Sequence, residues 1–366
     1  MKPFWARHRS RSSSTRQTPH PVNPVTFAEL TTLGVGGPAT QLVTVTTRDE
    51  FVTAFRDITM GHDEWLILGG GSNIVVADAG LDYPVIRVAT RGITEQVDSD
   101  TVLVDVEAGE NWDDLVAHCV SAGWAGIEAL SGIPGTVGAA PIQNIGAYGA
   151  ELSEVLDSIE FIHESTGEIE RLAAAKLELG YRHSRIKSGE LRGAVLSVRL
   201  RLVAANTSQP IRYSQLADAL SVELGQTVAL ADVRAAVLRV RAAKSMVFSA
   251  SDLDSHSAGS FFMNPVVRSE FARDLPQFAP RFDAGVNADG TAMVKLSAAW
   301  LIEHSGIGRG FSLAGSNAAV SSKHTLAIVN RGGATAEQVM ELARFIELRV
   351  QQTFGVNLVA EPTYLH

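Results

Sequence analysis

Cysteine and long uncharged apolar runs are both scarce in this chain of 366 residues. Cys119 is its one cysteine, which excludes an internal disulfide and a cysteine-rich metal cage. We therefore expect no metal site and a reducing compartment, the cytoplasm. No uncharged apolar stretch reaches the ~18 residues of a membrane span, so no membrane insertion is expected. The net charge of −9 argues against a dedicated nucleic-acid binder.

Acidic residues are missing from the start of the chain, where Lys2, Arg7, Arg9, Arg11 and Arg16 occur. No apolar stretch follows that could form the core of a signal peptide. This composition predicts a disordered basic tail over residues 1–21, with a tether to nucleic acid or membrane as the alternative.

The remaining sequence is typical of a globular protein with a sizeable core, since hydrophobic residues make up 45% and charged residues 19%. Its length predicts two or three domains, and the polar segment 244–257 is a candidate boundary. Alternating apolar patterns predict strands, and capped periodic patterns predict helices. The predicted strands are 65–68, 74–77, 101–106 and 197–203, and the predicted helices are 111–123, 233–244, 297–304 and 335–355. The pattern indicates a mixed α+β fold.

Two glycine patterns that suggest a dinucleotide site lack the required context. Residues 34–39 match G-x-G-x-x-A, but the residues after Pro38 are typical of a strand, whereas the motif needs a helix N-terminus. Residues 306–310 follow a predicted helix instead of a strand. Neither pattern therefore indicates a Rossmann-type dinucleotide-binding site.

A third glycine pattern, Gly69-Gly70-Gly71-Ser72-Asn73, lies between two predicted strands. Three glycines leave successive amide N–H groups unobstructed, which favours an anion-binding nest, although a plain tight turn is the alternative. A longer segment, Gly126 to Gly149, is dense in small residues and has neither helical nor strand periodicity. An irregular segment of this length inside a compact domain is usually functional.

These two segments, in this order, resemble the FAD-binding core of the UDP-N-acetylenolpyruvoylglucosamine reductases. The resemblance extends from about Phe27 to Pro362 and implies that FAD is bound without a covalent link. The residues that it assigns to FAD are Gly69, Gly70, Gly71, Ser72, Asn73, Ser131, Pro134, Gly135, Thr136, Gly138, Ala139, Asn144, Gly146, Ala147, Tyr148 and Gly149.

Four further blocks match this family in order. Taken alone, the blocks that begin at Tyr181, Gly259 and Ala360 have simpler explanations: a solvated basic face, a core strand with two aromatic residues, and a surface glutamate. The blocks are Tyr181-Arg182-His-Ser-Arg-Ile-Lys187, Ile211-Arg-Tyr213-Ser-Gln-Leu216, Gly259-Ser260-Phe-Phe-Met-Asn264-Pro265 and Ala360-Glu361-Pro362. The second block is similar to the branch whose tyrosine-bearing loop folds over substrate.

The resemblance implies that NADPH, through FAD, reduces UDP-N-acetylglucosamine enolpyruvate to UDP-N-acetylmuramate in peptidoglycan precursor synthesis. It implies that Arg182 holds the substrate carboxylate, that Ser260 donates a proton and that Glu361 assists. Residues implied to contact the sugar nucleotide or NADPH are Tyr181, Tyr213, Lys244, Asn264 and Lys295.

The implied architecture is a multi-domain FAD-binding fold of the vanillyl-alcohol-oxidase/PCMH type plus a smaller α/β substrate domain. We expect FAD subdomain 1 at 22–89 joined by 356–366, FAD subdomain 2 at 90–244 and the substrate domain at 245–355. A monomer is expected.

The sequence departs from the family in the long linker 245–257, in the basic tail and in the ending Thr363-Tyr-Leu-His366, where members often carry a second acid and an arginine. Two rivals stay open. One is an oxidase of the same superfamily, which often tethers flavin through a histidine near the glycine turn. The other is a flavin-binding protein without catalysis.

Overall fold

The computed structural model describes residues 25–366, whose contacts form two compact units. Unit 1 consists mainly of Ala39–Gly70 and Asp82–Ala242, and unit 2 of Thr26–Pro38, Gly71–Leu81 and Ala243–His366. The predicted basic tail, residues 1–21, lies outside the described residues. Each unit has its own core and is described separately.

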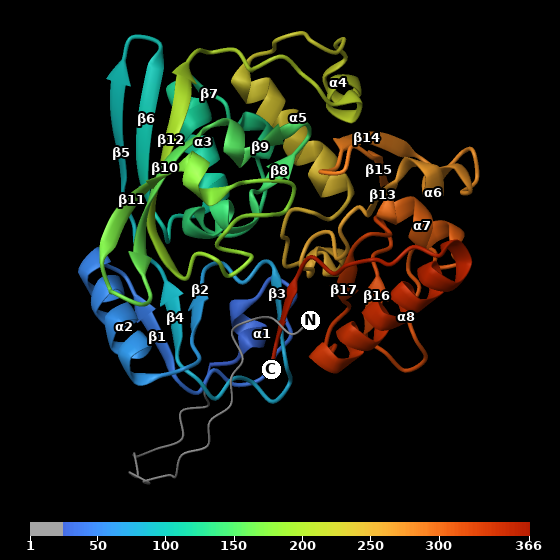
Figure 1. Cartoon of the computed structure of the whole chain (residues 1–366), viewed down its shortest axis with the longest axis horizontal. Coiled ribbons are helices and arrows are strands. Elements are labelled where there is room, and N and C mark those ends of the chain that lie inside the picture. The colour runs from blue at the N-terminus through green and yellow to red at the C-terminus, as the bar shows by residue number, and fades with distance from the viewer. Residues whose placement is uncertain (1–24) are drawn as a thin grey trace. The chain divides into compact units, whose positions relative to one another are not determined.

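A small parallel sheet in unit 1 carries the strand that leads into the glycine turn. Its order is β1-β4-β2, with helix α2 packed against it (Figure 1). Thr47 caps α2 by accepting a hydrogen bond from Glu50 N, and Phe51 and Phe55 on its inner side are fully buried. The bounds are β1 Leu42–Val45, α2 Arg48–Gly61, β2 Leu66–Leu68 and β4 Val85–Val88.

A six-stranded antiparallel sheet forms the larger part of unit 1, in the order β11-β10-β12-β6-β5, with β7 paired to the end of β12. In β12, Val198, Leu200 and Leu202 are buried, as the alternating pattern predicts. The bounds are β5 Ile93–Asp98, β6 Thr101–Glu107, β7 Trp124–Ala125, β10 Leu156–His163, β11 Ile169–Ala173 and β12 Gly193–Ala204; two short strands, β8 Gly146–Ala147 and β9 Ala150–Glu151, pair with each other.

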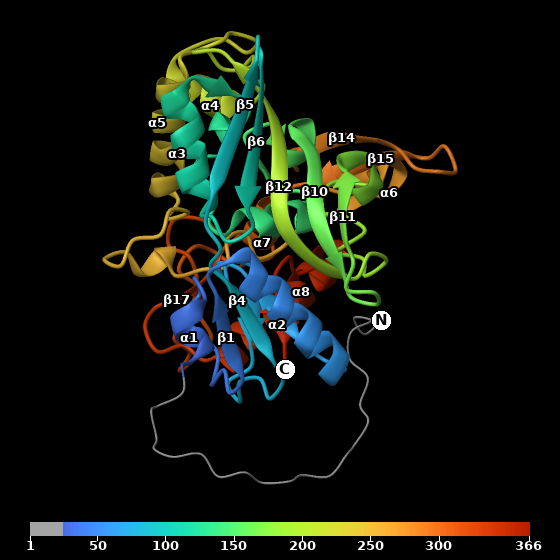
Figure 2. The same cartoon turned by 90° about the vertical axis from the view of Figure 1, so that its left-hand side faces the viewer.

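Helices α3 and α5 lie beside each other next to this sheet (Figure 2). Asn111 caps α3 by accepting hydrogen bonds from Asp113 N and Asp114 N, and Gly123 ends it at φ +74°, a conformation that favours glycine. Asp113 of α3 forms a bidentate ion pair with Arg234 of α5, at 2.6 and 2.9 Å. The bounds are α3 Trp112–Ala122, α4 Ser214–Leu220 and α5 Leu230–Ala243.

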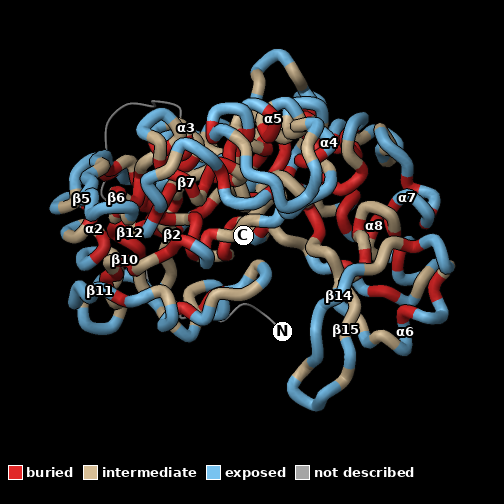
Figure 3. The backbone as a smooth tube through the Cα atoms, turned by 90° about the horizontal axis from the view of Figure 1, so that it is seen from above, coloured by how far each residue is buried: buried red, intermediate tan, exposed pale blue. Residues whose placement is uncertain are grey.

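Unit 2 packs α7 and α8 against short strands around a second core. Thr335 and Gln338 form the predicted capping box of α8, and Gly355 ends this helix. The β14–β15 hairpin is largely exposed at its tip (Figure 3). The bounds are α1 Phe27–Leu30, β3 Ile74–Val76, β13 Val266–Arg268, α6 Ser269–Arg273, β14 Arg281–Val286, β15 Ala292–Leu296, α7 Ala298–His304, β16 Ala318–Val320, β17 Ile328–Asn330, α8 Ala336–Phe354 and β18 Thr363–Leu365.

The two strands that flank the glycine turn belong to different sheets. β2 pairs with β4 in unit 1, whereas β3 pairs with the C-terminal strand β18 in unit 2. The chain therefore passes from one unit to the other between Gly70 and Gly71. The division into three domains stays a prediction; the small sheet, the six-stranded sheet and the sheet of β13, β14 and β15 each fall within one of its ranges.

The rejected dinucleotide patterns have the predicted surroundings. Residues 34–39 lead into strand β1 and not into a helix, and residues 306–310 follow α7. The mixed α+β fold is confirmed. Along residues 25–366, no helix combines the length and apolarity needed to cross a bilayer.

Candidate active site

The first two residues of the glycine turn, Gly69 and Gly70, adjoin the glycine-rich loop, residues 126–149, in unit 1. A Cβ added to Gly70 would lie 2.7 Å from Gly135 Cα, and one added to Gly69 would overlap Thr136 Oγ1. Side chains at both positions are therefore excluded by close backbone approach. Two motifs far apart in the sequence, both assigned to FAD, lie side by side.

The glycine-rich loop contains two short 3-10 helices, Glu128–Leu130 and Val137–Gln143, and is otherwise irregular. It is fixed to the sheet because Gly138 N donates to Ala108 O at 2.8 Å, where an added Cβ would lie 2.5 Å from the Ala108 side chain. The fully buried Ser131 donates its hydroxyl to Glu128 O at 2.6 Å. The Ser131 side chain thus stabilises the loop itself.

Asn144 organises the end of the loop from a left-handed backbone conformation at φ +47°. It is 1% exposed, and its amide nitrogen donates to Glu151 Oε2 at 2.9 Å and Gly180 O at 3.2 Å. Its amide oxygen accepts from Ser153 N at 2.9 Å. These contacts join the loop to the segment that carries Arg182.

Arg182 lies in a tight turn against the glycine-rich loop, with φ +51°. Its Nη2 donates to Gly146 O at 3.3 Å, and its guanidinium lies 5.6 Å from the centre of the Tyr181 ring. Arg185, by contrast, pairs with the exposed Glu190. The explanation of a solvated basic face therefore suits Arg185, whereas Arg182 is held on the loop.

Tyr148 and Tyr213 make an edge-to-face contact with ring centres 5.8 Å apart. Tyr148 is partly buried, and burial raises the pKa of its hydroxyl. Tyr213 precedes α4 and is 44% exposed. The loop end and the predicted substrate tyrosine are therefore neighbours.

Sequence reasoning missed Arg241, at the end of α5. Its Nε donates to Gly132 O at 3.1 Å, and its guanidinium also hydrogen-bonds Tyr148. Burial lowers the pKa of Arg241. Arg241 thus contacts both the start and the end of the glycine-rich loop. The signal that could have found it is its seven-residue spacing from Arg234, which places the two on one helix face.

Ser260 and Glu361 lie on neighbouring backbone segments of unit 2. Glu361 N donates to Phe261 O at 2.9 Å, and Phe262 pairs with Ala360 in an antiparallel bridge. Phe261 and Phe262 are both buried in the core, so the simpler explanation for this block holds for the aromatic residues. Ser260 itself is partly buried.

The predicted phosphate-binding residues Lys244, Asn264 and Lys295 also lie in unit 2. Asn264 Oδ1 accepts from Ala298 N at 2.9 Å and so caps α7. Lys295 is in β15, paired with Val266 of β13. Burial lowers the pKa of His324 to about 4, and the charges of Lys244 and Arg309 add to this effect. His324 had no signal in the sequence.

The predicted site residues thus form two groups. Unit 1 contains Gly69, Gly70, the loop residues from Ser131 to Gly149, Tyr181, Arg182 and Tyr213; unit 2 contains Gly71, Ser72, Asn73, Lys244, Ser260, Asn264, Lys295 and Glu361. Among residues 25–366, no three His, Cys, Asp or Glu side chains gather in a way that could hold a metal ion.

Comparisons with known proteins assign both units. A model of an FAD binding domain matches residues 39–173, and a model of the UDP-N-acetylenolpyruvoylglucosamine reductase C-terminal domain matches residues 251–365. UDP-N-acetylenolpyruvoylglucosamine reductase of Leifsonia xyli is 49% identical over 370 residues, covering 93% of this chain and 98% of the relative. The chain belongs to the UDP-N-acetylenolpyruvoylglucosamine reductase family.

Other members of this reductase family agree. The Thermobifida fusca reductase is 44% identical over 347 residues, covering 93% of this chain and 97% of the relative. The crystal structure of the Thermus caldophilus reductase is 28% identical, with a TM-score of 0.61 over 93% of this chain and 98% of that chain. The predicted fold class, an FAD-binding domain with a further domain, is confirmed.

The residues present fit FAD, the cofactor of this oxidoreductase. Gly69 and Gly70 let the glycine turn approach the glycine-rich loop closely, and the two glycine motifs offer backbone amides suited to an anionic dinucleotide. The stretch 65–77 contains no histidine that could tether flavin. Non-covalent FAD is the form that these residues suit.

Proposed function

We propose that Arg182, Ser260 and Glu361 are the groups with which this reductase converts UDP-N-acetylglucosamine enolpyruvate to UDP-N-acetylmuramate. The reaction uses NADPH and belongs to peptidoglycan precursor synthesis. The observation that carries the assignment is the pairing of the Ser260 and Glu361 segments, with Glu361 N donating to Phe261 O at 2.9 Å. A protein that only bound flavin would need no such pair.

When bound, FAD supplies hydride transfer from NADPH to the terminal carbon of the enolpyruvyl group. Negative charge then develops on the adjacent carbon and the substrate carboxylate. Arg182 suits this charge because a guanidinium is permanently positive and binds a carboxylate through two parallel hydrogen bonds. Its own hydrogen bond to Gly146 O fixes it on the loop before substrate binds.

The Ser260 hydroxyl donates the proton that the adjacent carbon takes up, which completes addition of a hydride and a proton across the double bond. Glu361 assists from the neighbouring segment. Tyr181, Tyr213, Lys244, Asn264 and Lys295 are proposed to bind the sugar nucleotide or NADPH, the lysines as compact charges for phosphate. For Asn264 this leaves the amide nitrogen, since its oxygen caps α7.

The test is Ser260→Ala, followed by flavin absorbance in two half-reactions. Reduction by anaerobic NADPH should keep its native rate, while reoxidation by the enolpyruvyl sugar nucleotide should slow by about 10²–10⁴-fold. Ser251→Ala, at an exposed serine, is the matched control. An equal loss in both half-reactions would remove Ser260 from the role of proton donor.

The same absorbance experiment on the native protein separates the rivals. Bleaching by NADPH and recovery with the enolpyruvyl substrate supports the reductase. Recovery only with oxygen would support an oxidase.

We also propose that the enzyme works in the cytoplasm as a monomer. Cys119 is buried and unpaired with any second cysteine, which suits a reducing compartment. Size-exclusion chromatography with light scattering should give a mass near 39.0 kDa. A mass of twice this value would replace the monomer with a dimer.

A further inference from the structure

Buried residues flank Tyr213 on both sides, Ile211 before it and Leu216 and Ala217 of α4 after it. Ile211 is 5% exposed and packs with Leu216 and Val237, and its backbone bonds to Gln226 O at 2.9 Å and to Gly225 N at 2.8 Å. Tyr213, two residues later, is 44% exposed. Its backbone carbonyl accepts hydrogen bonds from Leu216 N and Ala217 N, so α4 fixes the main chain, and other contacts must orient the exposed side chain.

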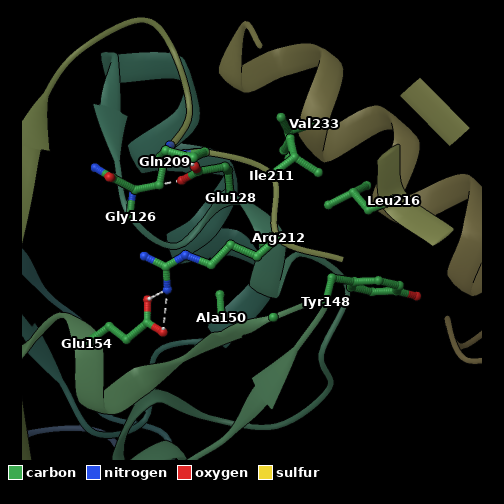
Figure 4. Close-up of a pocket in the computed structure, with 13 residues that line it drawn as sticks. Gly126, Glu128, Tyr148, Ala150, Glu154, Gln209, Ile211, Arg212, Leu216 and Val233 are labelled. Atoms are coloured by element: carbon green, nitrogen blue, oxygen red, sulfur yellow. Dashed lines mark hydrogen bonds and ion pairs between the residues drawn. The ribbon is translucent and has the colours of Figure 1, made fainter. Parts of the chain in front are cut away.

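A small cavity of about 40 Å³ lies beneath this segment, lined in part by Glu128, Gln209 and Ile211 (Figure 4). A void of this size holds one or two water molecules. Glu128 is buried and uses its carboxylate to accept from Gly126 N and Gln209 N. Beside the apolar packing of Ile211 and Leu216, the segment therefore also borders a partly polar depression, where the Arg212 side chain makes polar contacts.

The ion pair between Arg212 and Glu154 is the first such contact. Arg212 Nη1 lies 3.2 Å from Glu154 Oε1; both residues line the cavity, and Figure 4 shows the arginine side chain in contact with the glutamate. Glu154 ends the 3-10 helix Leu152–Glu154, which is separated from the end of the glycine-rich loop only by the short strand β9. The pair therefore joins the residue before Tyr213 to the flavin-binding side of unit 1.

Close approach of the loop end is the second contact. Gly149 adopts φ +82°, and a Cβ there would lie 3.2 Å from Arg212 Cβ and 3.7 Å from Tyr213 Cβ. On the other side, the Tyr148 ring meets the Tyr213 ring at 5.8 Å, and Arg241 holds the Tyr148 hydroxyl. The Tyr213 ring therefore contacts the Tyr148 ring, whose hydroxyl Arg241 holds in place. The Cβ atom of Tyr213 lies close to Gly149, where a side chain would crowd it.

From these contacts we propose that Arg212 and Glu154 are positioning residues that hold Tyr213 against Tyr148 at the end of the glycine-rich loop. The consequence for catalysis rests on the proposed function of Tyr213 as a substrate contact. Because the Arg212 and Glu154 side chains are 57% and 43% exposed, salt screens the pair, and its effect is moderate.

The test begins with Glu154→Gln in the FAD-loaded enzyme. Hydrogen exchange of the Leu216 and Ala217 amides, which donate to Tyr213 O, should become about two- to fivefold faster, the range that an exposed ion pair permits. KM for the enolpyruvyl sugar nucleotide should rise by a similar factor, with kcat and the rate of flavin reduction by NADPH unchanged. Glu170→Gln, which removes the exposed acid facing His163, is the matched control and should change neither readout.

Charge reversal provides the rescue. Glu154→Arg alone should exceed the effect of Glu154→Gln, and adding Arg212→Glu should restore both exchange and KM towards native values. In a Tyr213→Ala background, Glu154→Gln should no longer change KM, because its effect passes through Tyr213. Persistence of the KM effect in that background would overturn the positioning role.

Two outcomes separate this inference from the function on which it rests. Unchanged amide exchange in Glu154→Gln, with KM raised by Tyr213→Ala, overturns the inference and leaves the substrate role of Tyr213 intact. Faster exchange in Glu154→Gln, with KM unaffected by Tyr213→Ala, supports the positioning role and removes Tyr213 from substrate binding.

Discussion

Alanine at Gly70 should separate the two glycine motifs. The new Cβ would lie 2.7 Å from Gly135 Cα, whereas carbon atoms in contact prefer about 3.5–4.0 Å. The backbones must therefore move apart by about 1 Å. Overpacking of this kind costs about 1–3 kcal/mol, against an entropic gain of about 0.4–1 kcal/mol for replacing glycine. We expect a net loss of about 1–2 kcal/mol in unfolding free energy, together with weaker FAD binding.

Gly69→Ala is an informative comparison with Gly70→Ala because the atom that its new Cβ would meet belongs to a side chain and not to the backbone. The new Cβ would overlap Thr136 Oγ1, but its next neighbours are Ala139 Cβ at 3.5 Å and Thr136 Cβ at 3.6 Å, which are ordinary contacts. Adding Thr136→Ala should therefore remove most of the cost of Gly69→Ala. Gly70→Ala has no such rescue, since Gly135 already lacks a side chain.

The assay is urea unfolding of the apoprotein, with titration of FAD by quenching of its fluorescence. The double-mutant cycle of Gly69→Ala and Thr136→Ala should give a coupling of about 1 kcal/mol, above the ~0.3–0.5 kcal/mol scatter of independent sites. Measuring the apoprotein keeps any direct contact of Thr136 with FAD out of the cycle. A Gly70→Ala protein as stable as the native one, with native FAD affinity, would refute the packing argument.

Two further predictions concern buried titratable groups. Because burial lowers the pKa of His324 to about 4, the unfolded chain alone gains this proton as pH falls from about 6.5 to 4, so stability should decline by up to about 3 kcal/mol across that window. His324→Gln should therefore reduce the slope of a plot of the urea unfolding midpoint against pH, whereas His62→Gln, at an exposed histidine, should leave this slope unchanged. Equal slopes for the native and His324→Gln proteins would contradict the effect. Burial also raises the pKa of Cys119 to about 12, so a disulfide reagent should label this thiol only after denaturation; stoichiometric labelling of native protein would show the thiol to be accessible.

The elements that sequence analysis predicted well are those specified by neighbouring residues. Asn111 caps α3, and Thr335 begins α8 with its capping box. The alternation along 197–203 predicted the buried face of β12, although β12 itself extends from Gly193 to Ala204. Caps and periodicity act within a few residues, so they can be recognised without knowing the fold.

Other features depend on partners that are distant in sequence. Nothing local indicates that β2 and β3, separated by five residues, pair with different strands in different units. Asn144 was assigned to FAD, yet its side chain spans Glu151, Ser153 and Gly180. These hydrogen bonds form only when separate segments of the chain meet. The sequence could therefore single out Asn144 but could not predict which residues its side chain contacts.

The atypical C-terminus shows how backbone pairing can take the place of side chains. Glu361 lacks the second acid and the arginine that often follow it in the family, and Thr363 to Leu365 form β18 instead. This strand pairs with β3, Thr363 N donates to Asn73 O at 3.1 Å, and Asn73 Nδ2 donates to Glu361 O at 3.3 Å. On its other side, Glu361 N donates to Phe261 O. Because hydrogen bonds to its N–H and its C=O fix the Glu361 main chain from both directions, its backbone is held beside Phe261 without the missing side chains, and the glycine turn ending in Asn73 becomes part of that support.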